Sequence, residues 1–373
     1  MDSKMIAKCG DDDPIPITNQ FVGAKMGSVC WQADVDQPSL FATGSFDDAP
    51  NTSVTIWHVN SGNDANQAST LGKNDDAVKF ERVAAKRVAG DVSKVAFVDA
   101  THLIVSYCGS VALYDLQQSP NGRVDLSERA VWSNIHAREC SAFSVENHEL
   151  ITVGCDGTLC VVNLQTPNKS PVTCRHKTAS IFCCAHVSQS QIVTGTSSGH
   201  VHLVDTRSDR NSTALTVEVP QSSGVTCVAP RPAQRHLVAV GTRSGRVGFV
   251  DVRNTKGIAA ETVQLADTTI WQMMFHAEYP ENCFSCDDDG AVLHWDMSTF
   301  RDTNIGTTTN VSSVSTGLTD WLTSADILCD RMKLQNLLPG QRYPVNCIDV
   351  TDNRLLAATE SANLVLIQGL VMK

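Results

Sequence analysis

Short apolar runs alternate with turn-forming residues along most of the chain at a regular spacing. The stretch CFSCDDDGAVLHWD combines an apolar run, a polar turn at Gly290, a second run of alternating polarity and a closing aspartate, Asp296. Four upstream stretches repeat this order, with glycine-to-glycine steps of 48, 42, 46 and 45 residues. The glycine and the closing residue six positions later are Gly109/Asp115, Gly157/Asn163, Gly199/Asp205, Gly245/Asp251 and Gly290/Asp296.

Two weaker copies flank these five. Residues 41–59 have a longer turn and His58 at the closing position, and residues 355–368 have Ala362 at the glycine position and Gln368 at the closing position. Repeats of about 40–45 residues with four short strands each are typical of WD-type β-propellers. The sequence therefore predicts an all-β fold, a seven-bladed WD40-type β-propeller in which residues 1–373 form a single domain.

The ends of the chain and two polar stretches complete this prediction. The last copy stops five residues before the C-terminus, after its third strand, and would expose an unpaired edge. The strand-like segment IPITNQFVGAK (15–25) is expected to supply the missing outer strand and close the ring. Residues 1–14 are expected to form an acidic tail, and polar inserts are expected at about 60–86 and 299–342.

Charge and cysteine usage exclude several classes of protein. The net charge of −11 argues against direct binding of nucleic acid, and no apolar run is long enough for membrane insertion. The N-terminal residues turn acidic after one short apolar pair, unlike a secretory signal. The fourteen cysteines are scattered without a disulfide framework, so we expect reduced thiols in an intracellular protein.

The strand-ending aspartates are expected to hold turns rather than to do chemistry. In WD-repeat proteins an aspartate at this position typically joins a hydrogen-bond network with a histidine from an earlier loop. Two histidines lie 21 and 23 residues before the glycines of their repeats, which suits that role. The predicted structural turn and blade network comprises Asp115, Asp205, Asp251, Asp296, His136 and His176.

Other candidate chemistry is sparse. Cys283 and Cys286 form a C-x-x-C, but a zinc site needs a second pair, and residues three apart on a strand face opposite ways. His200 and His202 share one strand face and lack a third ligand. We therefore predict no catalytic residues, no metal site and no cofactor, and a protein that is not an enzyme.

Three stretches resemble the nucleoporin 43 family of WD-repeat nucleoporins. FATGSFDDAPNTSVTIW, with Trp31 ten residues upstream, is similar to the first blade of that family. Residues 270–296 resemble its sixth blade, including Trp271, His276 and Pro280. DWLTS followed by CDRMKLQNLLPG resembles its last connection, with the matching residues Trp321, Leu322, Asp330, Arg331, Leu337, Leu338 and Pro339. The acidic tail and the Ala362/Gln368 copy depart from the family pattern.

The resemblance implies a scaffold subunit of the nuclear pore complex, in its Y-shaped outer-ring complex. The implied partners are other nucleoporins, especially α-solenoid and propeller subunits of the short arm, with this chain as one monomer in a hetero-oligomer. The family is associated with pore assembly, with mRNA and protein transport, and with the kinetochore in mitosis. Trp321 and Leu322 are candidate interaction residues, with packing against blade six as the alternative.

Two other functions stay open at this point. The sequences VDTR and VDVR close consecutive repeats with Asp-x-Arg, which looks like the box that docks WD-repeat substrate receptors on cullin-RING ubiquitin ligases. In that alternative, Arg207 and Arg253 face the ligase adaptor. The net acidity also allows histone or chromatin binding, although no motif in the chain points to it.

Overall fold

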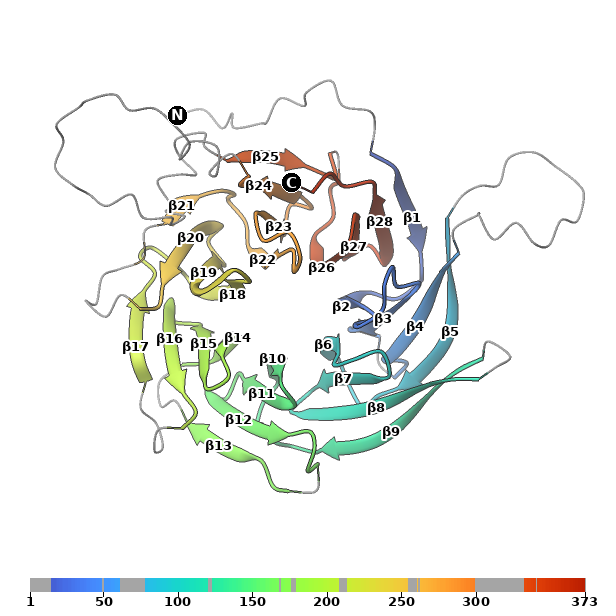
Figure 1. The fold of residues 1–373 in the computed structure, drawn as a ribbon, viewed down its shortest axis with the longest axis horizontal. Helices are drawn as coiled ribbons and strands as arrows, with labels where there is room; N and C mark the ends of the chain where they lie inside the picture. Colours follow the sequence, from blue (N-terminus) through green and yellow to red (C-terminus); the bar gives the residue numbers. More distant parts are fainter. Residues whose placement is uncertain are drawn as a thin grey trace, which may run out of the picture.

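The protein is a ring of β-sheets. The computed structural model describes residues 15–48, 50–60, 78–119, 123–167, 169–175, 179–207, 213–253, 260, 262–298, 332–339 and 341–372. In this part of the chain all regular secondary structure is β-strand, and seven four-stranded antiparallel sheets surround a common centre (Figure 1). The predicted seven-bladed propeller is therefore confirmed.

Six blades consist of four consecutive strands, counted from the centre outwards. Blades 1 to 3 contain β2 (Met26–Trp31), β3 (Leu40–Ser45), β4 (Ser53–Asn60), β5 (Lys79–Arg87), β6 (Val92–Phe97), β7 (His102–Tyr107), β8 (Ser110–Gln118), β9 (Val124–Trp132), β10 (Cys140–Glu146), β11 (Glu149–Gly154), β12 (Thr158–Asn163) and β13 (Val172–Arg175). Blades 4 to 6 contain β14 (Ile181–Ser188), β15 (Gln191–Thr196), β16 (His200–Asp205), β17 (Thr213–Glu218), β18 (Val225–Arg231), β19 (Gln234–Thr242), β20 (Arg246–Asp251), β21 (Thr262–Gln264), β22 (Ile270–Phe275), β23 (Asn282–Asp287), β24 (Val292–Asp296) and β25 (Lys333–Asn336).

Blade 7 joins the two ends of the chain, as expected. Its inner strands are β26 (Val345–Thr351), β27 (Arg354–Thr359) and β28 (Asn363–Gln368), and its outer strand is the N-terminal β1 (Ile17–Phe21). The β1 strand pairs antiparallel with β28, from Ile17 opposite Ile367 to Phe21 opposite Asn363. This pairing covers the edge of β28 that the sequence would otherwise leave open.

Two outer strands correct the expected inserts. The last part of the expected insert 60–86 forms most of β5. The stretch 299–342 likewise contains β25. Six of the nine side chains of β5 are exposed, so the alternation that identifies a half-buried strand is weak there. That residues 1–373 form a single domain stays a prediction, and the tail 1–14 lies outside the described residues.

The antiparallel topology gives the ring two faces. We define the top face by the connections that lead into each innermost strand and by the turns between second and third strands. The bottom face carries the turns between first and second strands and the connections that leave each third strand. Apolar side chains of one blade pack against the next: one buried cluster combines Val193, Val201 and Leu203 of blade 4 with Val228 and Val240 of blade 5.

The repeated turn on the top face uses a left-handed residue, although not always at the glycine. Gly290 has a φ of 88°, and Ala362, at the same position in blade 7, has a φ of 59°. In blade 2 the left-handed residue is Cys108, at 48°, and not Gly109. Gly109 is needed for space instead, because a Cβ there would lie 2.3 Å from the carbonyl oxygen of His136.

A β-bulge recurs at the second residue of every innermost strand. The register of β22 against β23, for example, shifts between Ile270 and Gln272, which leaves Trp271 as the extra residue. Bulges re-aim a side chain out of the sheet. The seven bulged residues, which all lie at the top end of their strands, are Gly27, Ser93, Ser141, Phe182, Thr226, Trp271 and Asn346.

Candidate functional site

Three of the predicted aspartates cap the turn that follows their own strand. Asp205 Oδ1 accepts the backbone N–H of Arg207 at 2.9 Å, and Asp251 does the same for Arg253 at 2.9 Å. Asp296 accepts the N–H of Ser298 at 2.9 Å. These contacts are the aspartate turns that a short carboxylate forms with the chain two residues on, so they hold the bottom-face connections.

Arg207 and Arg253 lie on this bottom face beside the same aspartates. The Arg207 guanidinium is 2.8 Å from Asp205, and the hydrogen bonds from the Arg207 side chain lower the pKa of Asp205 to about 2. The two arginine side chains are 72% and 52% exposed. The geometry thus uses both arginines within their own blades, and their role in docking a ligase adaptor stays a prediction.

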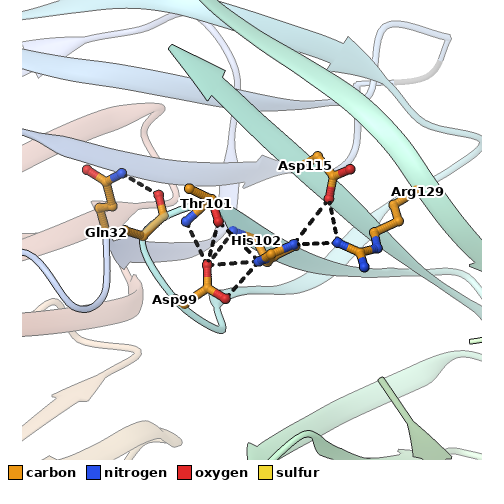
Figure 2. A network of polar contacts seen from close by, with 7 residues as sticks. Gln32, Asp99, Thr101, His102, Asp115 and Arg129 are labelled. Atoms are coloured by element: carbon orange, nitrogen blue, oxygen red, sulfur yellow. Dashed lines mark hydrogen bonds and ion pairs between the residues drawn. The ribbon is translucent and has the colours of Figure 1, made fainter. Parts of the chain in front are cut away.

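Asp115 belongs to a different network at the bottom of blade 2 (Figure 2). His102 Nδ1 is 2.7 Å from Asp99, and Arg129 donates to His102 Nε2 at 2.7 Å. Arg129 also lies 3.4 Å from Asp115. Burial tends to raise the pKa of Asp99, but hydrogen bonds from Thr101 and His102 outweigh it and leave that pKa lowered.

The geometry of this network differs from that of a catalytic acid–histidine dyad. In a catalytic dyad the second imidazole nitrogen would face a reacting group. Here the nitrogen that points away from Asp99 accepts a hydrogen bond from a guanidinium. The side chain of Gln32, also drawn in Figure 2, donates to the carbonyl of Ala100 at 2.6 Å and links blade 1 to the same turn.

His136 contacts Asp156, a residue outside the predicted turn and blade network. His136 lies on the top face, where its ring nitrogens are 2.7 Å from Thr158 Oγ1 and 2.9 Å from Thr152 Oγ1. Its acidic neighbour is Asp156, at 3.4 Å, in the turn between second and third strands. The expected partnership of His136 with a strand-ending aspartate is therefore wrong, because those aspartates lie on the opposite face.

Electrostatics in this turn follow from its burial. Burial lowers the pKa of His136, against the opposing effect of Asp156. Burial also acts to raise the pKa of Asp156, but hydrogen bonds from Thr158 and from the Ala137 N–H leave it lowered. The pairing of His136 with Asp156 has a signal in the sequence, which is a histidine about twenty residues before an Asp-Gly turn. Here that turn is Asp156-Gly157.

The remaining predicted site residues cannot be related to this geometry. His176, Trp321 and Leu322 lie outside the described residues, so their proposed roles stay predictions. Of the residues that carried the resemblance in the last connection, Leu337 and Leu338 are buried, at 2% and 7% exposure, and follow β25. Trp271 is 39% exposed at the top of blade 6.

Cysteine and histidine pairs show no metal-binding arrangement in the described residues. Cys283 packs in the cluster between blades 5 and 6 and Cys286 in the cluster between blades 6 and 7, so they face opposite ways as expected. The rings of His200 and His202 stack at 6.0 Å on one strand face. No described group of three or more His, Cys, Asp or Glu residues is placed to hold a metal ion.

A hollow of about 480 Å³ opens on the bottom face where blades 3, 4 and 5 meet. Pro230, Pro232 and His186 line it together with Arg235. The Arg235 guanidinium already forms a two-pronged pair with Glu146 of blade 3, at 2.5 and 2.7 Å. This ion pair links blade 5 to blade 3 across blade 4. The Arg235 guanidinium in the hollow is therefore already paired within the ring.

These features define a WD-type β-propeller: the sheets form a closely packed ring, and the polar contacts stabilise turns and blade junctions. In the described residues no helix is long and apolar enough to cross a membrane. The model of a propeller family described as the nucleolar protein 10-like N-terminal domain matches residues 133–319, which is half of the chain. The chain belongs to that family of propellers.

Two relatives match over nearly the whole length. The chain is 24% identical over 376 residues to nucleoporin Nup43 of Homo sapiens. The alignment covers 92% of this chain and 96% of that protein. It is 24% identical over 373 residues to nucleoporin Nup43 of Mus musculus, with the same coverage. The predicted resemblance to the nucleoporin 43 family is confirmed, and the comparisons lend no support to a ligase receptor.

Proposed function

We propose that the protein is a non-enzymatic scaffold subunit of the nuclear pore complex. The observation that carries this proposal is similarity to nucleoporin Nup43 over 92% of this chain and 96% of the relative. Because a fold alone does not choose a partner, the full-length match matters more than the propeller itself.

The finer proposal places the chain in the Y-shaped outer-ring complex at the nuclear envelope. There it binds α-solenoid and propeller nucleoporins of the short arm as one monomer in a hetero-oligomer. In this position it supports pore assembly and transport of mRNA and protein, and it accompanies the complex to kinetochores in mitosis. The net charge of −11 supports protein partners and argues against direct contact with nucleic acid.

A rigid ring suits a scaffold. Apolar clusters join neighbouring blades, and backbone pairing closes the circle at β1 and β28. Partner-binding surfaces on such a ring keep their relative positions. The ring therefore loses little conformational entropy when a partner binds. Trp321 and Leu322 remain the proposed anchor in the last connection.

Affinity purification of the tagged protein from interphase cells tests the proposal, with the tag alone as control. We expect α-solenoid and propeller nucleoporins in near-equal amounts with the protein. Recovery of a cullin and its adaptor without nucleoporins would overturn it. The double variant Arg207→Ala, Arg253→Ala then identifies the surface: it should leave nucleoporin recovery unchanged, whereas a ligase adaptor would be lost.

A further inference from the structure

The bulged residues at the top of the innermost strands link most blades to the next one. The Ser93 hydroxyl donates to the Cys140 carbonyl of blade 3, and the Ser141 hydroxyl donates to the Ile181 carbonyl of blade 4. Thr226 makes the same bond to Ile270 of blade 6. In blade 7, Asn346 donates to the Met26 carbonyl of blade 1 at 3.1 Å. A short polar side chain is therefore the structural solution at this position.

Blade 6 departs from that solution. Its bulged residue, Trp271, donates its indole N–H to Asp288 in a turn of its own blade, at 2.9 Å. The other large bulged side chain, Phe182 in blade 4, is covered by the Arg243 guanidinium 5.1 Å from its ring centre. Trp271 stays 39% exposed, whereas the other tryptophans in the described residues, Trp31, Trp57, Trp132 and Trp295, are at most 6% exposed.

The surroundings of Trp271 add a second exposed aromatic residue and negative charge. The connection into blade 7 lies against the turn after Asp288: a Cβ on Gly290 would come 2.6 Å from the Tyr343 carbonyl oxygen. The Tyr343 side chain is 57% exposed. Residues 265–272, 287–291 and 337–344 carry three acids that reach the surface, Asp267, Asp288 and Asp289, against one base, Arg342. Among the described residues no cation forms an ion pair with Asp288 or Asp289.

A cationic side chain fits these groups. The face of an indole attracts a guanidinium, and carboxylates beside the ring add a charge that a planar arginine fork can share. The bond from Trp271 to Asp288 fixes the ring in advance, so a ligand need not order it. Exposed tryptophan and tyrosine side chains also dominate protein interfaces.

We propose that the top face of blades 6 and 7, centred on Trp271, Asp288 and Tyr343, binds an arginine-bearing basic segment of a partner protein. An arginine of that segment stacks on the indole, and neighbouring basic residues face Asp288 and Asp289. This inference concerns a surface that the scaffold role does not assign, and it does not depend on that role.

Fluorescence anisotropy with the purified full-length protein tests the proposal. The probe is a labelled octapeptide of alternating arginine and glycine, and the control probe replaces each arginine by citrulline, which keeps the shape and removes the charge. We expect the arginine peptide to bind at micromolar to sub-millimolar concentrations, more weakly as salt rises, and the citrulline peptide to fail. Equal binding of both peptides, or no binding of the arginine peptide up to about 1 mM, overturns the proposal.

Matched variants locate the site. Trp271→Ser installs the residue type that blades 2 and 3 use at this bulge, so the fold should survive, and binding should weaken about tenfold or more. Asp288→Asn keeps an acceptor for the indole and should weaken binding severalfold by removing charge. Tyr279→Ser removes a similarly exposed aromatic side chain, 44% exposed, from the bottom face and should change nothing.

The variants are first compared with the wild type by thermal melting. If Trp271→Ser melts cooperatively and still binds the arginine peptide as the wild type does, the proposal is wrong. If Trp271→Ser fails to fold, Asp288→Asn decides, and its unchanged affinity and salt dependence overturn the proposal. Nucleoporin recovery from cells is measured separately, so failure at this surface leaves the scaffold proposal standing.

Discussion

At the scale of single residues, Asp349 is a titratable group at a blade junction. It lies on β26 of blade 7, and its carboxylate accepts the Trp31 N–H of blade 1 at 2.6 Å and the Val350 N–H at 3.0 Å. Burial raises the pKa of Asp349 to about 6, although the two backbone hydrogen bonds and the charge of Lys94 favour the ionised form. The folded ring therefore holds this proton more tightly than the unfolded chain does.

This difference makes one contribution to stability depend on pH. Below the ordinary pKa of aspartic acid the carboxyl is protonated in both states, and the contribution is fully present. Between about pH 4 and 6 only the unfolded chain loses its proton, so the contribution is lost as the pH rises through the folded pKa. We expect the free energy of unfolding of Asp349→Asn, taken relative to the wild type at the same pH, to rise by about 2 to 3 kcal/mol from pH 4 to pH 7.5.

Urea unfolding of both proteins at the two pH values measures this gain, with each free energy of unfolding taken relative to the wild type at the same pH. The comparison cancels the other titrating groups, such as Glu146, whose pKa is lowered first of all by its hydrogen bond from Arg235. A stability difference between the two proteins that is the same at pH 4 and pH 7.5 would contradict the assignment.

At the scale of elements, the repeated turn of the top face shows what a sequence pattern can and cannot convey. Spacing identified this turn in blade 7 from Ala362, and the left-handed φ of 59° there matches Gly199, at 78° in blade 4. The sequence pattern did not reveal that Gly109 is required because a side chain would not fit there. That requirement depends on the backbone of His136, in the connection into the next blade. Contacts between blades are non-local, so one repeat read alone does not contain them.

Exchanging the residues at these turns tests the backbone argument. Ala362→Gly should raise the free energy of unfolding by about 1 kcal/mol, because glycine adopts a left-handed conformation without the Cβ clash. Gly199→Ala is the reverse experiment and should lower it by about 1 kcal/mol, since the nearest atom to its new Cβ is 3.2 Å away and conformational strain dominates. Urea unfolding at one pH measures both, and a loss of stability in Ala362→Gly would refute the interpretation.

The same distinction separates the fold from the candidate site. The order of blades and the strand-ending aspartates were predictable because each depends on local spacing. The closing strand was predictable because the last copy stops after its third strand and leaves an edge to be paired. The link between His136 and Asp156 could have been found from a histidine ahead of an Asp-Gly turn. The bulges were not predictable, because Ser141 and Trp271 differ in sequence and share only their register against the second strand.

At the scale of the whole molecule, the ring is closed by contacts that lie far apart in the chain. Beyond the pairing of β1 with β28, the Gln20 side chain on β1 bonds both ways with the backbone of Phe80 on β5, at 2.9 and 2.8 Å. Lys25 adds a bridge on the top face, 3.1 Å from Asp47 of blade 1 and 2.7 Å from Glu360 of blade 7. The N-terminal segment thus joins the first and last blades at several points.

Removing that segment should therefore affect the entire ring. Deletion of residues 1–25 exposes the hydrogen-bonding edge of β28 and removes Gln20 and Lys25, so blade 7 loses its outer strand and its ties to blade 1. We expect the truncated protein to lose cooperative thermal unfolding and to aggregate. Deletion of residues 1–14 is the matched control, because the difference between the two truncations reports on residues 15–25 alone. If both truncated proteins melt in the same cooperative transition, the closing strand is dispensable, and the apolar clusters between blades 6, 7 and 1 suffice to hold the ring.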